Sequence, residues 1–126
     1  MEKIIIDGGL PLKGKVKISG SKNSALPILA STILWPGKYK FHNVPDIKDV
    51  RTMLELLKFL GSSYKFSNNK VEINSKLVNR FEAPYELVKT MRASVLIWGS
   101  LLGRLKKAKI SFPGGCAIGD RPIDQH

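Results

Sequence analysis

Apolar residues recur every three or four positions in three segments of the chain, which is the spacing that places them on one face of a helix. The first helix is predicted to follow Ser21 and to run to about Leu34, with Pro27 tolerated because it lies near the helix start. The second covers Ile47 to Leu60, and the third is predicted to run unbroken from Pro84 through Leu102.

Polar and glycine residues mark the ends of the second helix. Asp46 is a candidate N-cap, because its carboxylate can accept hydrogen bonds from the first amides of the helix. Gly61 follows the last apolar residue, where a left-handed cap favours glycine. Asn68 and Asn69 then separate two short apolar runs, which is typical of a hairpin turn.

The remaining apolar runs are short and rich in β-branched or aromatic residues, and several alternate with polar residues. They predict strands at residues 3–6, 15–18, 38–42, 63–66, 70–73 and 108–112. Strands that alternate with helices indicate a layered α/β (α+β) domain whose helices cover the sheet.

Composition limits the classes of protein that this chain can represent. Its 126 residues suffice for one domain at most, and 43% hydrophobic with 25% charged residues is typical of a globular chain. The formal net charge of +11 favours anionic partners. The single cysteine excludes an internal disulfide and an all-cysteine metal site, and it suits a reducing compartment.

No segment of the sequence resembles a secretion signal or a membrane span. The apolar run at the amino terminus is interrupted by Asp7 and Gly8, and the most apolar stretch, Val95 to Leu102, is far shorter than the ~20 residues that cross a bilayer. We therefore expect a cytoplasmic protein without a membrane partner.

Residues 113–126, PGGCAIGDRPIDQH, contain most of the reactive groups. Cys116 follows two glycines after a predicted strand, and Arg121 lies close enough in sequence to favour its thiolate, which would make the thiol both a proton donor and a nucleophile. The competing interpretation is a buried, inert cysteine. His126 is a second candidate partner for the thiol, although spacing alone does not bring the two together.

Two further cationic positions are candidates for binding an anion. Lys22 and Asn23 lie where a predicted strand ends and a helix begins, so an ammonium group and helix amides can share one anion. Lysine and asparagine are also ordinary residues in a first helical turn. Arg92 lies one residue away from an apolar helix face, where a surface charge that covers the core with its stem is the simpler interpretation.

Three segments, SGSKNSALPILA, HNVPDIKDVRTMLELLKFLG and PGGCAIGDRPIDQH, together resemble the UDP-N-acetylglucosamine enolpyruvyl transferases of peptidoglycan synthesis. The resemblance runs along nearly the whole chain, and the cysteine loop separates this family from the relative that acts on shikimate 3-phosphate. It implies two globules, each built from three split βαβαββ units around a cleft, as an inside-out barrel. Residues 1–21 would then pair with the second globule, and residues 22–126 would form part of the first.

The resemblance also implies a reaction, in which the enolpyruvyl group of phosphoenolpyruvate moves to the sugar 3-hydroxyl and phosphate leaves. Cys116 matches the family's proton donor and the thiol that fosfomycin alkylates, and Lys22 and Asn23 match residues that contact the substrates. The resemblance further implies sugar-nucleotide binding by Arg92, Arg121, Pro122, Ile123, Asp124 and Gln125. Neither a metal nor another cofactor is implied.

The family's chains are much longer than this one, and its general base and further arginines lie in parts that have no counterpart here. We therefore expect an amino-terminal portion that is inactive alone and needs the remainder of the enzyme as its partner. Two alternatives are a basic nucleic-acid-binding module, for which the sequence shows no dedicated motif, and a structural fragment that folds only beside a complementary chain.

Overall fold

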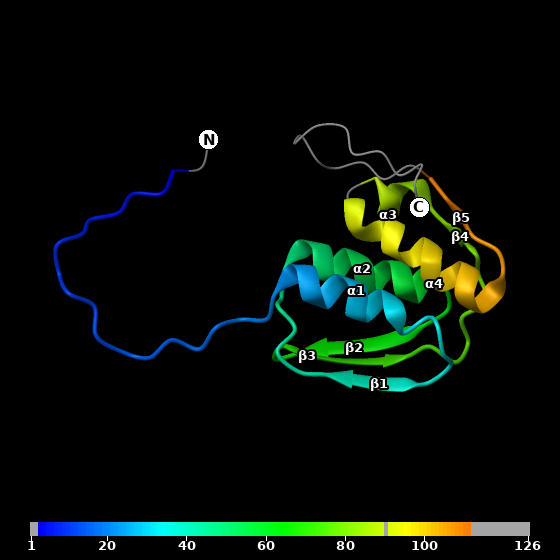
Figure 1. Ribbon diagram of the computed structural model, residues 1–126, viewed down its shortest axis with the longest axis horizontal. Helices are drawn as coiled ribbons and strands as arrows, with labels where there is room; N and C mark the ends of the chain where they lie inside the picture. The colour runs from blue at the N-terminus through cyan, green and yellow to red at the C-terminus, as the bar shows by residue number, and fades with distance from the viewer. Residues whose placement is uncertain (1–2, 90, 112–126) are drawn as a thin grey trace.

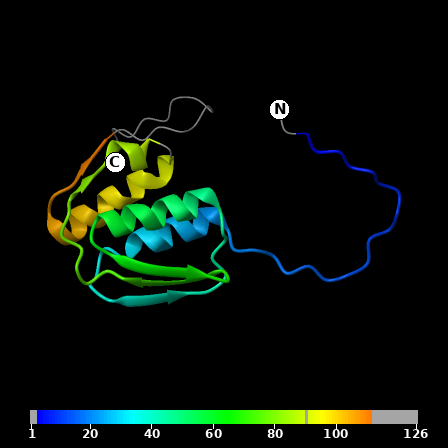
Figure 2. The ribbon, with the colours of Figure 1, turned by 180° about the vertical axis from the view of Figure 1, so that it is seen from behind.

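The computed structural model describes residues 3–89 and 91–111. Helices α1 (Lys22–Ser31) and α2 (Lys48–Phe59) lie side by side on one face of a three-stranded sheet, and α4 (Val95–Leu105) packs against α1 on the side away from that sheet (Figure 1). The reverse view in Figure 2 shows the same layers. The first two predicted helices and the layered arrangement are therefore confirmed, with changes in the helix bounds, whereas the third predicted helix is broken.

The main sheet is antiparallel and has the order β1-β3-β2. Its strands are β1 (Lys38–Phe41), β2 (Ser63–Ser67) and β3 (Lys70–Asn74). Because β1 and β2 both pair antiparallel with β3, they run in the same direction on either side of it. With α2 as the crossover, β1 and β2 thus form a split βαβ unit. The predicted hairpin is confirmed, and Asn68 and Asn69 both adopt positive φ in its turn.

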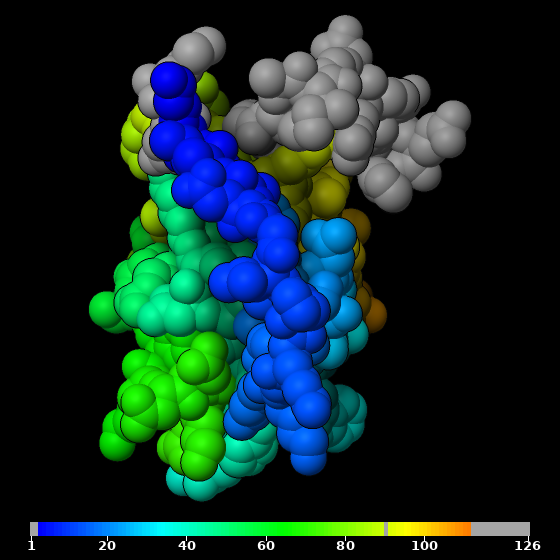
Figure 3. All heavy atoms as spheres, turned by 90° about the vertical axis from the view of Figure 1, so that its left-hand side faces the viewer, coloured from blue at the N-terminus to red at the C-terminus, as the bar shows by residue number. Residues whose placement is uncertain are grey.

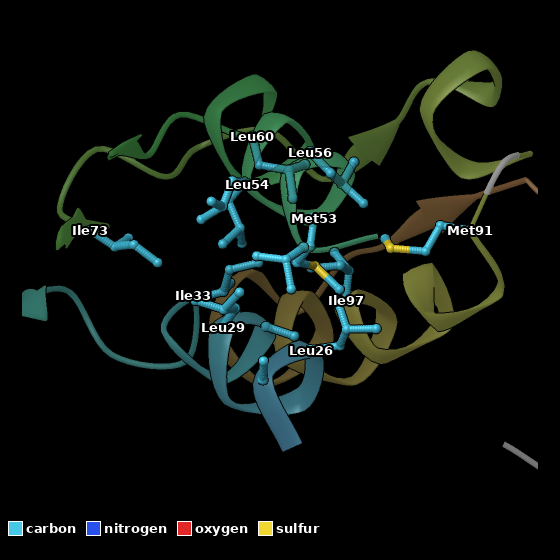
Figure 4. Packing of buried hydrophobic residues seen from close by; sticks show 14 of the residues in the cluster. Leu26, Leu29, Ile33, Met53, Leu54, Leu56, Leu60, Ile73, Met91 and Ile97 are labelled. Atoms are coloured by element: carbon cyan, nitrogen blue, oxygen red, sulfur yellow. The ribbon is translucent and has the colours of Figure 1, made fainter. Parts of the chain in front are cut away.

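Alternation along the strands gives the sheet one apolar and one polar face. The register aligns Phe41, Val71 and Phe66 in one row of the inner face, and Lys40, Glu72 and Lys65 in a row of the outer face. The inner rows pack beneath α1 and α2. Figure 4 labels part of the buried core, namely Leu26, Leu29, Ile33, Met53, Leu54, Leu56, Leu60, Ile73, Met91 and Ile97.

The segment after β3 departs most from the sequence prediction. The expected helix from Pro84 through Leu102 is broken into α3 (Tyr85–Val88), the 3-10 turn η1 (Arg92–Ser94) and α4. The break includes Met91, whose extended backbone (φ −141°, ψ 110°) places its side chain in the core. The Met91 side chain is buried only when the chain folds, so the spacing of apolar residues along the sequence does not reveal the break.

A second sheet was only partly predicted. Strand β5 (Lys109–Ile110) lies within the predicted strand at 108–112 and pairs in parallel with β4 (Glu82–Ala83). Residue 112 lies outside the described residues. Strand β4 has only two residues, and a segment of that length is too short to show an alternation of polar and apolar residues. It was therefore not predicted from the sequence.

The two strands predicted at 3–6 and 15–18 are absent from the structure, and this prediction is wrong for the chain by itself. Figure 1 shows the segment leading away from the helices and the sheet, and in Figure 3 the same blue segment lies in front of them, on the side that faces the viewer. Ile4, Ile5, Ile6, Val16 and Ile18 are all largely exposed. A strand requires a neighbouring strand to satisfy its backbone groups, and the described residues supply none here. The pairing of residues 1–21 with a second globule stays a prediction.

The ends of α2 confirm one predicted cap and correct the other. Asp46 does not cap the helix, because Ile47 occupies the N-cap position, and the Asp46 carboxylate instead accepts two hydrogen bonds of 2.6 Å from Arg51. Gly61 ends the helix with φ +111°, as predicted. A Cβ atom at Gly61 would lie 2.5 Å from the carbonyl oxygen of Leu77, so both backbone conformation and space require glycine there.

Arg104 connects three parts of the fold through its guanidinium group. It donates hydrogen bonds to the carbonyl oxygens of Ile33 at 3.1 Å, Ser75 at 2.8 Å and Lys76 at 3.1 Å. These bonds join α4 to the end of the first helical segment and to the loop after β3. A charged donor shared by three backbone acceptors makes Arg104 a structural residue.

Two glycine substitutions should have opposite effects on stability. We expect Gly61→Ala to lower the free energy of unfolding by about 2 kcal/mol or more, because it combines a strained φ with a backbone clash. Gly99→Ala, where nothing lies within 4 Å of the added Cβ, should raise it by about 0.5–1 kcal/mol through helix propensity. Urea unfolding followed by circular dichroism measures both, and equal effects would contradict the assignment.

Alkaline stability should depend on Tyr64. Its hydroxyl donates a 2.5 Å hydrogen bond to Glu55, and this bond, together with partial burial, raises the pKa of Tyr64 to about 12. Because the folded-state pKa lies above the unfolded value of about 10, the stabilisation is complete below pH 10 and is lost as the pH rises to 12. In Tyr64→Phe the loss of stability between pH 10 and 12 should be smaller than in the parent. Tyr85→Phe, at an exposed site, should retain the parent's dependence.

Candidate functional site

The three long helices begin at the same end of the molecule. In Figure 1 the first residues of α1, α2 and α4 all lie toward the left-hand side. Within the described residues, none of these helix starts has a side-chain cap hydrogen bond. The first backbone amides of a helix carry partial positive charge, so this end of the molecule is suited to an anion.

Lys22 is the first residue of α1 and reaches the start of α2. Its Nζ atom lies 2.8 Å from Oδ2 of Asp49, in the first turn of α2. The Lys22 side chain is 50% exposed and that of Asp49 is 31% exposed. The ion pair thus holds the ammonium group at the shared helix end while leaving half of the side chain accessible.

The sequence prediction did not include Asp49. An acidic residue in the first turn of a helix is so common that its presence carries no functional signal by itself. Only the packing of α1 against α2, far apart in sequence, brings this carboxylate to Lys22.

The backbone before α1 is fixed by close packing against the loop after β1. A Cβ atom at Gly20 would lie 1.9 Å from the carbonyl oxygen of Asn43, so only glycine fits. That loop is held in turn by Asn69, whose side-chain amide donates to the carbonyl oxygen of Val44 at 2.9 Å and whose own carbonyl accepts from the Val44 amide at 2.9 Å. The hairpin turn therefore positions the residue pair that opens α1.

Asn23 is the second residue of α1 and is exposed. A groove of about 310 Å³ runs between α1 and the loop after β1 and is lined by Ser21, Ser24, His42 and Asn43, among others. Lys22 and Asn23 do not line it. The groove and the cationic helix end are therefore neighbouring but separate features, and the charge chemistry belongs to the helix end.

Arg92 is the first residue of η1 and is half-buried. The sequence placed it beside the apolar face of one long helix, whereas the structure places it on a turn that leads directly into α4. Since α4 begins at the same end as α1 and α2, the fold brings Arg92 to the same side of the molecule as Lys22.

The remaining predicted site residues lie outside the described residues. They are Cys116, Arg121, Pro122, Ile123, Asp124 and Gln125, together with the candidate partner His126. The described chain reaches this segment from β5, so the predicted order of a strand followed by the cysteine segment is confirmed up to Ser111.

The described residues lack the features of two other kinds of site. Residues 3–89 and 91–111 contain no group of three or more histidine, cysteine or acidic residues arranged to hold a metal ion. Over the same residues, no helix combines the length and apolar character needed to cross a membrane.

The chain is similar to proteins of one family along nearly its full length. Residues 6–126 match the family described as EPSP synthase (3-phosphoshikimate 1-carboxyvinyltransferase). The chain belongs to this family. A crystal structure of the enolpyruvyl transferase NikO from Streptomyces tendae matches 75% of this chain and 22% of its own chain, with a TM-score of 0.67 and 24% identity. This likeness confirms the predicted fold class.

Closer relatives bear the name UDP-N-acetylglucosamine 1-carboxyvinyltransferase. The proteins of Methylacidiphilum infernorum and Thermodesulfovibrio yellowstonii are 57% and 55% identical to this chain over 126 residues, and that of Lawsonia intracellularis is 54% identical. In each case the match covers 100% of this chain and 30% of the relative. The chain thus spans about a third of the length of the relatives it matches, and the resemblance found in its motifs is confirmed.

Lys22 and Arg104 should respond differently to loss of their charge. We expect Lys22→Met to lower the free energy of unfolding by less than about 1 kcal/mol, because its ion pair with Asp49 is half-exposed. Arg104→Met should lower it by about 2 kcal/mol or more, because three backbone carbonyls lose a charged donor. Urea unfolding of both variants makes the comparison, and a Lys22 effect as large as that of Arg104 would mean that Lys22 is structural.

Proposed function

We propose that the longer protein containing this chain transfers the enolpyruvyl group of phosphoenolpyruvate to the 3-hydroxyl of UDP-N-acetylglucosamine and releases phosphate. The observation that carries this proposal is the 57% identity, over the whole chain, to a relative bearing the name of that activity. The reaction is the first committed step of peptidoglycan synthesis, so the proposal assigns the protein to cytoplasmic cell-wall formation and, through it, to cell shape and division.

The electrostatics of the described residues support this assignment. Both substrates are anions, and their mutual repulsion must be offset before they can react. Lys22 is the first residue of α1, beside the start of α2, and Arg92 opens the turn that leads directly into α4. Asp49 limits the excess positive charge and holds the Lys22 ammonium group in place. In the proposal, Lys22 and Asn23 contact the substrates, and Arg92 reaches toward the sugar nucleotide.

The proposed chemistry has two stages, and Cys116 takes part in the first. Its thiol donates a proton to the methylene carbon of phosphoenolpyruvate, the sugar hydroxyl oxygen bonds to the adjacent carbon, and the hydroxyl proton passes to a base outside this chain. In the second stage the new methyl group loses a proton to a base, the bond from carbon to the phosphate oxygen breaks with its electron pair leaving on the phosphate, and the carbon–carbon double bond re-forms, while the Cys116 thiolate regains a proton from solvent. Arg121 to Gln125 are proposed to hold the nucleotide.

This reaction requires groups beyond the 126 residues. Because the chain spans only 30% of the first relatives' length, we propose that the remainder of the longer protein completes the cleft and supplies the base. The 126-residue chain assayed alone should therefore release no phosphate. Positive charge at the site is supplied by lysine, arginine and helix amides, and the proposal includes no metal or cofactor.

The decisive test compares Cys116 with Cys116→Ser in the full-length protein. The parent should release phosphate from phosphoenolpyruvate in the presence of UDP-N-acetylglucosamine, and the variant should be slower by at least about 100-fold, in the range typical of a lost proton donor. With fosfomycin and the sugar nucleotide, intact mass should show one adduct on the parent and none on the variant.

The outcomes of this test separate the elements of the proposal. Unchanged phosphate release in the variant would remove Cys116 from the mechanism. Phosphate release that depends on shikimate 3-phosphate in place of the sugar nucleotide would assign the protein to the other branch of the family. Turnover by the isolated 126-residue chain at the full-length rate would refute the requirement for the remainder.

A further inference from the structure

The main sheet has an outer face that is charged and exposed. Helices α1 and α2 lie on the inner face only (Figure 1), and the outward-pointing residues of all three strands are exposed or half-buried. The charged residues on the outer face are Lys38, Lys40, Lys65, Lys70 and Glu72. We call these five residues the basic sheet face. It carries four positive charges and one negative charge.

The single acidic residue of this face is already shared between two lysines. Glu72 lies in a cross-strand row between Lys40 and Lys65, and its Oε1 atom is 2.8 Å from Nζ of Lys40. The hydrogen bond and charge of Lys40, and to a smaller extent the charge of Lys65, lower the pKa of Glu72. Among the described residues, no carboxylate oxygen lies within 4.0 Å of the amino groups of Lys38, Lys65 and Lys70. The face therefore retains a net positive charge.

A shallow hollow of about 250 Å³ lies on the sheet beside these lysines. Its lining includes Lys38, Lys65, Ser63 and Asn74. The side-chain oxygen of Asn74 accepts a hydrogen bond of 3.2 Å from the backbone amide of Lys76, which leaves the amino group of Asn74 to donate to a ligand. Ammonium, hydroxyl and amide donors around one hollow suit a carboxylate.

The composition of the face limits what can bind there. The large apolar residues that are exposed in the described part of the chain all lie outside β1, β2 and β3. A folded segment packed on this face would bury several unpaired ammonium groups, which is costly. Single-stranded nucleic acid favours aromatic side chains on which bases stack, and peripheral membrane binding favours apolar anchors beside the cations. An acidic peptide requires neither.

The spacing of the lysines matches an extended peptide. Lys38 and Lys40 are two residues apart on β1, so their backbone positions are separated by about 6.6 Å. Acidic residues at alternate positions of an extended segment have the same repeat.

We propose that the basic sheet face binds an extended acidic segment of a partner protein, with carboxylates at alternate positions of that segment. Lys38 and Lys40 pair with successive carboxylates along β1, and the hollow beside Lys65 admits a further one. The inference concerns a surface on the side of the sheet away from α1 and α2, and it does not depend on the proposed reaction.

Fluorescence anisotropy at low ionic strength tests this with the full-length protein and a fluorescein-labelled peptide of alternating glutamate and threonine. The double variant Lys38→Gln/Lys65→Gln should raise the Kd by about 5-fold or more, because two charge contacts are lost. The matched control Lys58→Gln/Lys107→Gln removes the same charge from exposed positions outside the sheet and should change the Kd by less than about 2-fold. Glu72→Gln should lower the Kd by about 2-fold or more, because it removes the one repulsive charge.

Each contrary outcome would overturn the proposal. Equal effects of the two double variants would reduce the interaction to net charge. Undetectable binding of the glutamate peptide, or equal binding of a glutamine–threonine peptide, would remove the acidic ligand. Tighter binding to phosphatidylglycerol vesicles or to duplex DNA, lost in Lys38→Gln/Lys65→Gln, would assign the face to that polyanion instead.

Thermal unfolding separates loss of binding from loss of the fold. All variants should keep a Tm within about 2 °C of the parent, as is usual for substitutions of exposed residues. The peptide titration uses neither phosphoenolpyruvate nor turnover, so failure here is distinct from failure of the proposed reaction.

Discussion

The packing of α1 against α2 over the main sheet is the interaction on which the other features depend. Leu29 from α1 and Ile33, just after its end, lie in the core with Met53 and Leu54 from α2, and this packing fixes the relative position of the two helix starts. Lys22 and Asp49 are then brought within 2.8 Å although they lie 27 residues apart. The apolar core therefore determines where the exposed charges lie.

Lys22 and Arg104 use their positive charges in different ways. The Arg104 guanidinium group donates to three backbone carbonyls, whereas the Lys22 ammonium group, on a side chain that is 50% exposed, pairs with the Asp49 carboxylate. A partly exposed ion pair contributes little to the free energy of folding, so the stability of the fold depends little on the Lys22 charge. The same protein thus contains one cation built into the fold and another placed at its surface.

Several apolar features of the chain lack cover among the described residues. The segment before α1 carries exposed isoleucines without a neighbouring strand, and β4 and β5 pair only with each other among the described strands. Apolar surface of this kind is unfavourable in water and becomes favourable when it is covered.

The sequence by itself determined the helices with strong periodicity, the hairpin at Asn68 and Asn69, the glycine cap at Gly61 and the family. These depend on local backbone preference or on motifs, which a linear sequence contains in full. The break at Met91, the two-residue strand β4 and the meeting of Lys22 with Asp49 were decided only by the tertiary structure. Each of these depends on a partner distant in sequence or on burial, and free energy gained through such contacts leaves no periodic signal along the chain.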